Sequence, residues 1–125
     1  MGLFSALLGN AGAVNPDELA KQYGTLLTDG ERIELGFKLV RDTFIFTNKR
    51  LILIDKQGIT GNKTEYKSIV YKAITRFSVE TAGTFDLDAV LNIWISNETV
   101  PSIQKQFNKS VDVYQVQKIL AQHVL

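Results

Sequence analysis

Asp86 and Asp88 are the residues whose types and spacing come closest to a catalytic or cation-binding pair. Residues two apart on a strand point to the same face, so the two carboxylates could act as acid and base or bind a cation. The sequence signals no nucleophile or third ligand to accompany them. We therefore favour the simpler interpretation, in which both carboxylates solvate the exposed face of a strand.

His123 is the only histidine in the chain. A catalytic role would need a partner nucleophile or carboxylate, and the sequence signals neither. The last turn of a helix favours a cation, so we interpret His123 as an electrostatic helix cap. One histidine and no cysteine argue against a structural zinc site and exclude thiol chemistry. We predict that the protein is not an enzyme and needs no cofactor or metal.

The stretch Gly58-Ile-Thr-Gly61 resembles a phosphate cradle only superficially. A P-loop needs Gly-x4-Gly-Lys-Ser/Thr at the start of a helix, whereas this stretch lies between predicted strands. We interpret the two glycines as residues that allow the backbone conformation of a loop.

Four basic residues are candidates for contact with an anionic headgroup or an acidic partner. They are Lys49, Arg50, Lys56 and Lys63. The alternative is a solvated hairpin tip whose charges protect a strand edge from aggregation. Both interpretations stay open on the sequence alone.

The composition excludes several function classes. The chain has 125 residues and a formal net charge of +1, with no basic block that could neutralise a run of phosphates, so we expect no nucleic-acid partner. No apolar run approaches the roughly 20 residues that span a bilayer. The first ten residues lack the basic start of a signal peptide. We expect one cytoplasmic domain over residues 1–125.

Residues 1–24 are predicted to form short helices. Leu3, Phe4 and Leu7 fall on one face of the first helix. Asn15 and Pro16 are a strong start for the second, because Asn caps helices and Pro suits the first helical position. Gly24 is predicted to end it.

The period changes from helical to two at Glu31, and residues 31–108 are predicted to be the sheet core. Ile33, Leu35, Phe37 and Leu39 are predicted to share one face. Asn48 is predicted to tolerate positive φ in the turn from Thr47 to Arg50. The seven predicted strands lie within 31–39, 42–46, 51–54, 66–69, 77–79, 85–96 and 101–107.

Residues 110–125 are predicted to form a closing helix. Ser110 can cap it, and apolar residues recur at helical spacing from Val113 to Val124. With no alternation of strands and helices, we predict a mainly β fold: a seven-stranded antiparallel sandwich or open barrel capped by this helix.

Val90 and Trp94 lie on the strand face that the core does not need. With Leu3, Phe4 and Leu7 they form a candidate oligomer interface, because aromatic residues are enriched at the centres of interfaces.

Three stretches resemble the bacterial pleckstrin-homology-like (PH-like) family. They are Asp55-Lys-Gln-Gly-Ile-Thr-Gly-Asn-Lys63, the run from Ile74 to Ala89, and Ile93-Trp-Ile-Ser96. The resemblance covers nearly the whole chain. It implies two orthogonal antiparallel sheets capped by a helix, and a tendency to assemble into homo-oligomeric rings.

The chain departs from the family pattern at two places. Val90-Leu91-Asn92 stands where Glu and then Leu-Lys are expected, and Val70 replaces a proline. The phosphoinositide signature of eukaryotic PH domains is a basic cluster around the first hairpin. This chain has only Lys38 and Arg41 there, so lipid specificity is not carried over.

These observations predict a non-enzymatic PH-like module that self-associates and binds an unknown protein partner. The alternative is a peripheral membrane domain that binds anionic lipid through the basic hairpin and the first helix, with weak affinity because the net charge is small.

Overall fold

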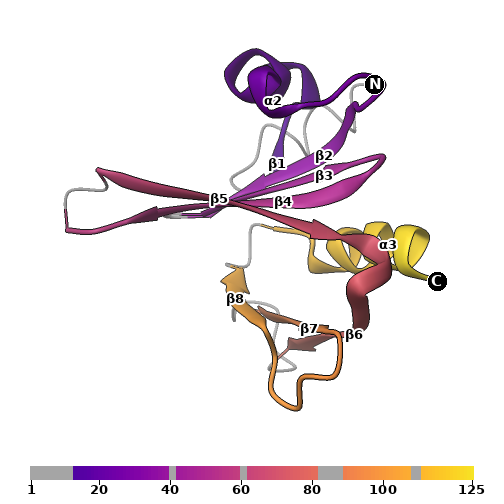
Figure 1. Ribbon diagram of the computed structural model, residues 1–125. Helices are drawn as coiled ribbons and strands as arrows, with labels where there is room; N and C mark the ends of the chain where they lie inside the picture. The colour runs from indigo at the N-terminus through magenta and orange to yellow at the C-terminus, as the bar shows by residue number, and fades with distance from the viewer. Residues whose placement is uncertain (1–12, 40–41, 60–61, 82–88, 108–110) are drawn as a thin grey trace. The chain divides into compact units, whose positions relative to one another are not determined.

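The computed structural model describes residues 13–39, 42–59, 62–81, 89–107 and 111–125 (Figure 1). The chain divides into two compact units, Met1–Ile69 and Val70–Leu125. The first unit contains a five-stranded antiparallel sheet in the order β1-β2-β3-β4-β5. Its elements are β1 (Ala13–Val14), α2 (Pro16–Tyr23), the 3-10 helix η1 (Gly24–Leu26), β2 (Ile33–Lys38), β3 (Asp42–Thr47), β4 (Arg50–Gln57) and β5 (Lys63–Val70), whose last residue belongs to the second unit.

Helix α2 begins as the sequence predicts. The Asp17 amide donates to Asn15 Oδ1 at 2.8 Å, and Pro16 occupies the first helical position. The predicted end at Gly24 marks a change of helix type, because Gly24 keeps a right-handed φ of −59° and the chain continues as η1.

Leu19 docks α2 on the sheet. It packs in a buried cluster with Ile45, Ile52 and Ile54. A side chain at position 36 would collide with Leu19 Cδ1, so Leu19 would have to shift to accommodate it. The close approach of helix and strand therefore depends on Gly36.

Strand β2 contains a β-bulge, so its apolar residues do not all share one face as predicted. The register shifts between Ile33 and Leu35, since Ile33 pairs with Thr47 and Leu35 with Phe46. A bulge adds one residue to a strand and puts the residues on either side of it out of phase. Ile33 therefore packs against the Leu19 cluster, while Leu35 shares the other face with Phe46.

The turn between β3 and β4 lies where it was predicted, but for another reason. Asn48 does not have positive φ, because Ser96 is the one non-glycine residue with positive φ in the described ranges. Instead, Thr47 Oγ1 accepts from the amides of Lys49 and Arg50 at 3.1 and 3.0 Å. Asn48 bonds across to the Arg32 amide and the Gly30 carbonyl oxygen.

The second unit is a three-stranded antiparallel sheet in the order β6-β7-β8, with a C-terminal helix. Leu91, Ile93 and Phe107 are fully buried on one face. Asn92 lies between Val90 and Trp94 on the other face, yet it is only 2% exposed, because side chains of both neighbouring strands cover it. The elements are η2 (Tyr71–Ala73), β6 (Ile74–Thr81), β7 (Ala89–Ile95), β8 (Ile103–Phe107) and α3 (Val113–Val124).

Helix α3 contacts β6 and η2. Its cap is Asp112, whose carboxylate accepts from the Tyr114 amide at 3.1 Å; the predicted cap Ser110 lies outside the described residues. Val116 and Leu120 are fully buried. His123 stacks on the Tyr71 ring with 4.2 Å between ring centroids, so it packs against an aromatic ring in addition to lying in the last turn.

Candidate functional site

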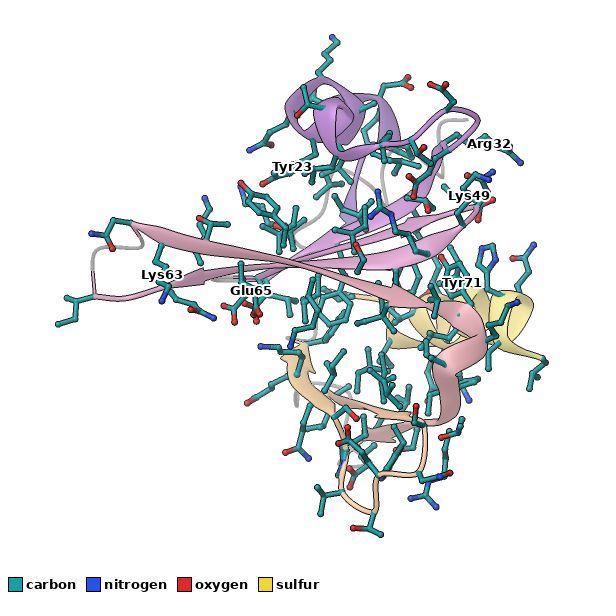
Figure 2. All side chains as sticks on the ribbon, in the orientation of Figure 1. Tyr23, Arg32, Lys49, Lys63, Glu65 and Tyr71 are labelled. Carbon is teal, nitrogen blue, oxygen red and sulfur yellow. The ribbon has the colours of Figure 1, made fainter. Side chains whose placement is uncertain are left out.

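A groove of about 300 Å³ lies in the first unit, beside the β4–β5 hairpin. We call it the tyrosine groove, and Figure 2 shows Tyr23 at the end of α2 on its helical side. Its lining residues are Gln22, Tyr23, Thr25, Leu26, Ile54, Lys56, Thr64 and Tyr66. The helical segments thus form one wall, and alternate residues of β4 and β5 form the other.

Arg50 fixes the helical wall to β4. Its Nη2 donates to the Leu26 carbonyl oxygen at 2.6 Å, and its Nη1 donates to Ser68 Oγ on β5 at 2.7 Å. The guanidinium also donates two hydrogen bonds to the Glu31 carboxylate, from Nε at 2.8 Å and from Nη2 at 3.0 Å. One side chain therefore ties η1, β4 and β5 together.

Glu31 is the buried anion of this network. Its side chain is fully buried, and it also accepts from Thr47 Oγ1 at 2.7 Å and from the Thr28 amide at 3.0 Å. The hydrogen bonds from Arg50 lower the pKa of the Glu31 carboxyl to about 2, and burial opposes this only in part. Glu31 is therefore ionised at neutral pH and stabilises the position of Arg50.

The second unit offers a different surface, which we call the polar face. Cross-strand pairing brings Arg76 opposite Trp94, Ser78 opposite Asn92 and Glu80 opposite Val90. The Arg76 guanidinium carbon lies 4.2 Å from the Trp94 ring centroid, a cation–π geometry.

Asn92 holds the centre of the polar face. Its Nδ2 donates to Glu80 Oε2 at 2.6 Å and to Ser78 Oγ at 3.2 Å, and its Oδ1 accepts from Gln104 at 2.8 Å. These bonds cross all three strands, so the side chains around Asn92 are fixed in place.

A hollow of about 300 Å³ opens beside the Arg76–Trp94 pair. Its lining residues are Thr75, Arg76, Trp94, Ser96, Asn97 and Glu98. Trp94 Nε1 donates to the Thr99 carbonyl oxygen at 3.4 Å, so the chain itself covers part of the ring.

The structure separates the four predicted anion contacts. Arg50 is committed to the network with Glu31, and Lys49 directly precedes β4, whereas Lys56 lies near its end. Figure 2 shows Lys49 far from Lys63. Lys49 and Lys56 are seven positions apart along the chain, which is about 23 Å of extended strand. Lys63 is exposed at the start of β5, near the Lys56 end. The four residues therefore do not form one basic patch.

Several predicted residues lie outside the described ranges: Leu3, Phe4, Leu7, Gly61, Asp86 and Asp88. Gly58 has φ 84°, which favours glycine and agrees with the loop interpretation. In the described part of the chain, no three His, Cys, Asp or Glu side chains gather as a metal site would require. None of the helices seen there has the length and apolarity to cross a bilayer.

The sequence analysis missed the tyrosine groove and the network that supports it. Tyr23 was predicted only as part of the helical segment 1–24, and Tyr66 only as part of the strand 66–69. Glu31 and Arg50 are 19 residues apart, and no local period links them. The one available signal was Arg50 directly before the apolar run from Leu51 to Ile54, because a charge next to a buried run needs a partner.

Two antiparallel sheets followed by a C-terminal helix define the pleckstrin-homology class of fold. The chain belongs to the bacterial PH domain family, whose pattern matches residues 2–124. The predicted family and fold class are confirmed, and the seven predicted strands correspond to β2 through β8; the two-residue β1 was not predicted.

Similar proteins cover almost the full chain. "Uncharacterized protein YjqA" of Bacillus subtilis (strain 168) is 54% identical over 121 residues, which is 97% of both chains. A DUF1696 family protein with a pleckstrin-homology domain from Shewanella loihica PV-4 has a TM-score of 0.81 at 54% identity, covering 94% of this chain and 99% of that one. A pleckstrin homology domain from Shewanella amazonensis SB2B also gives 0.81, at 51% identity and 99% coverage of both chains.

Proposed function

We propose that this PH-like domain is a non-enzymatic cytoplasmic module that self-associates and binds a protein partner. The observation that carries the proposal is the Arg76–Trp94 pair on the polar face. Tryptophan and arginine are the side chains most enriched at the energetic centres of protein interfaces. Here the two are already stacked, so less side-chain freedom is lost on binding.

The surroundings of the pair favour the same role. Val90 and Trp94 are both partly exposed on the polar face, and Asn92 between them is held by three hydrogen bonds. A rigid polar surface around an aromatic anchor is typical of non-obligate interfaces.

The carboxylates of both units support a non-enzymatic role. Glu31 is saturated by Arg50, Thr47 and Thr28, and Glu80 accepts from Asn92. These hydrogen bonds favour a structural role for both carboxylates.

Light scattering of the purified protein tests self-association. We expect wild type to exceed the monomer mass of 14.0 kDa and Trp94→Asp to lower the observed mass. Tyr114→Asp is the matched control, because Tyr114 is an aromatic residue on α3 that is 61% exposed. A monomeric wild type at high micromolar concentration would contradict the proposal.

The membrane alternative has less support, because Arg50 is engaged internally and Lys49 lies far from Lys56 and Lys63. Each basic residue near an anionic surface contributes only about 1 kcal/mol. We expect no co-sedimentation with acidic vesicles at physiological salt. Binding that disappears in a Lys56→Glu, Lys63→Glu variant would favour the lipid-binding function instead.

A further inference from the structure

We propose that β5 accepts an extended peptide of a partner protein, with an acidic side chain of that peptide in the tyrosine groove. The inference rests on the proposed function for partner binding only and is independent of self-association. It names both the surface and the chemistry of the partner.

Strand β5 lies at the edge of its sheet. This eight-residue strand ends the strand order of its sheet, and six of its residues are exposed. A long strand at a sheet edge presents backbone donors and acceptors that can pair with one more strand. Such pairing supplies affinity without sequence preference, so the side chains must supply the specificity.

The tyrosine groove lies beside that edge strand. Thr64 and Tyr66 of β5 line it together with Ile54 and Lys56 of β4. Side chains alternate along a strand, so every second residue of an added peptide would lie on the groove side. A space of about 300 Å³ has room for such a side chain.

The charge of the groove wall bears on which side chain the groove would accept. Among the lining residues that the structure describes, Lys56 carries the one full charge, and the others offer hydroxyl, amide and apolar groups. The next residues along the same strands, Asp55, Lys63, Glu65 and Lys67, alternate to the opposite face, where two acids balance two bases. The positive charge of Lys56 in the groove wall would attract an acidic side chain of the peptide.

The walls of the tyrosine groove are held in place before a partner binds. Tyr23 packs against the Leu19 cluster, and Arg50 holds the Leu26 carbonyl oxygen in the adjoining wall. Tyr66 is 52% exposed, which leaves its ring available for contact. Tyrosines on fixed backbone give large contact area at low entropic cost.

Isothermal titration calorimetry with a synthetic peptide tests the side-chain part of the proposal. The probe is an acetylated, amidated heptapeptide of alternating threonine and valine with a central glutamate, and its matched control has a central glutamine. We expect wild type to bind the glutamate peptide about fivefold more tightly than the glutamine peptide. Lys56→Gln should remove that difference, and Tyr66→Ala should weaken binding about tenfold.

The matched controls come from distant surfaces of the same chain. Lys49→Gln removes an exposed lysine at the other end of β4, and Tyr114→Ala removes an exposed tyrosine of α3. Both variants should bind both peptides as wild type does. Equal binding of the two peptides by wild type, or no binding at millimolar peptide, would overturn the proposal.

Backbone methylation of the peptide tests strand addition. An added strand turns alternate amides towards β5, so methylating one alternate set should abolish binding and methylating the other should not. Retained binding with both sets would overturn the proposal.

Light scattering of the same samples separates the two proposals. Assembly without peptide binding would refute this inference and leave self-association standing. A lowered mass in Tyr66→Ala would assign β5 to contact between copies of the chain and would also overturn it.

Discussion

Replacing Glu31 by glutamine tests the network that fixes the tyrosine groove. The substitution keeps the volume of the side chain and removes its charge. Arg50 would keep its contacts to Leu26 and Ser68 but lose its anion, with only a quarter of its side chain exposed to water. Breaking one partner of a buried ion pair is strongly destabilising, because the other charge remains uncompensated.

The magnitude follows from the pKa of Glu31. A carboxyl with a pKa of 4.5 in the unfolded chain and about 2 in the folded protein binds its proton more weakly when folded. That difference corresponds to about 3 kcal/mol of stability at neutral pH. Because the folded pKa is the lower one, the contribution is complete above pH 4.5 and is lost as the pH falls from 4.5 towards 2.

Urea unfolding followed by circular dichroism, at one fixed protein concentration, measures this contribution. We expect Glu31→Gln to lower the free energy of unfolding by about 3 kcal/mol at pH 7 and by much less near pH 2. The control Glu65→Gln changes an exposed carboxylate of β5. Its free energy of unfolding should stay within about 0.5 kcal/mol of wild type at both pH values. A Glu31→Gln difference that is the same at both pH values would refute the reasoning.

Two further substitutions test the packing of each unit. Gly36→Ala should cost about 1–3 kcal/mol, because the new methyl group meets Leu19, whereas Gly24→Ala should cost nothing in the same urea titration, since nothing lies within 4 Å of that position. Equal effects of the two glycine substitutions would show that α2 does not dock through Leu19. Leu120→Ala should cost about 2–5 kcal/mol, because Leu120 is fully buried on α3; a loss under about 1 kcal/mol would show that the helix does not close its unit.

Local sequence signals predicted most of the fold. Strands β3 and β7 follow from period-two apolar residues, β4 follows from a fully apolar run, and the start of α2 follows from Asn15 and Pro16. These signals succeed because each depends on residues within one element.

The failures come from contacts that cross elements. The bulge at Ile33–Leu35 is set by pairing with β3, and the burial of Asn92 is set by Glu80 and Gln104 on both neighbouring strands. Arg50 was a candidate for either a ligand contact or a solvated hairpin charge, because its partner Glu31 is distant in sequence. The same limit applies to the tyrosine groove, whose residues come from α2, η1, β4 and β5.

Sedimentation equilibrium of the wild-type protein tests the central claim most directly. The proposed function predicts a mass that is a multiple of 14.0 kDa and that falls towards one copy in Trp94→Asp. A single species of 14.0 kDa for wild type, at every concentration up to high micromolar, would contradict self-association through the Arg76–Trp94 surface.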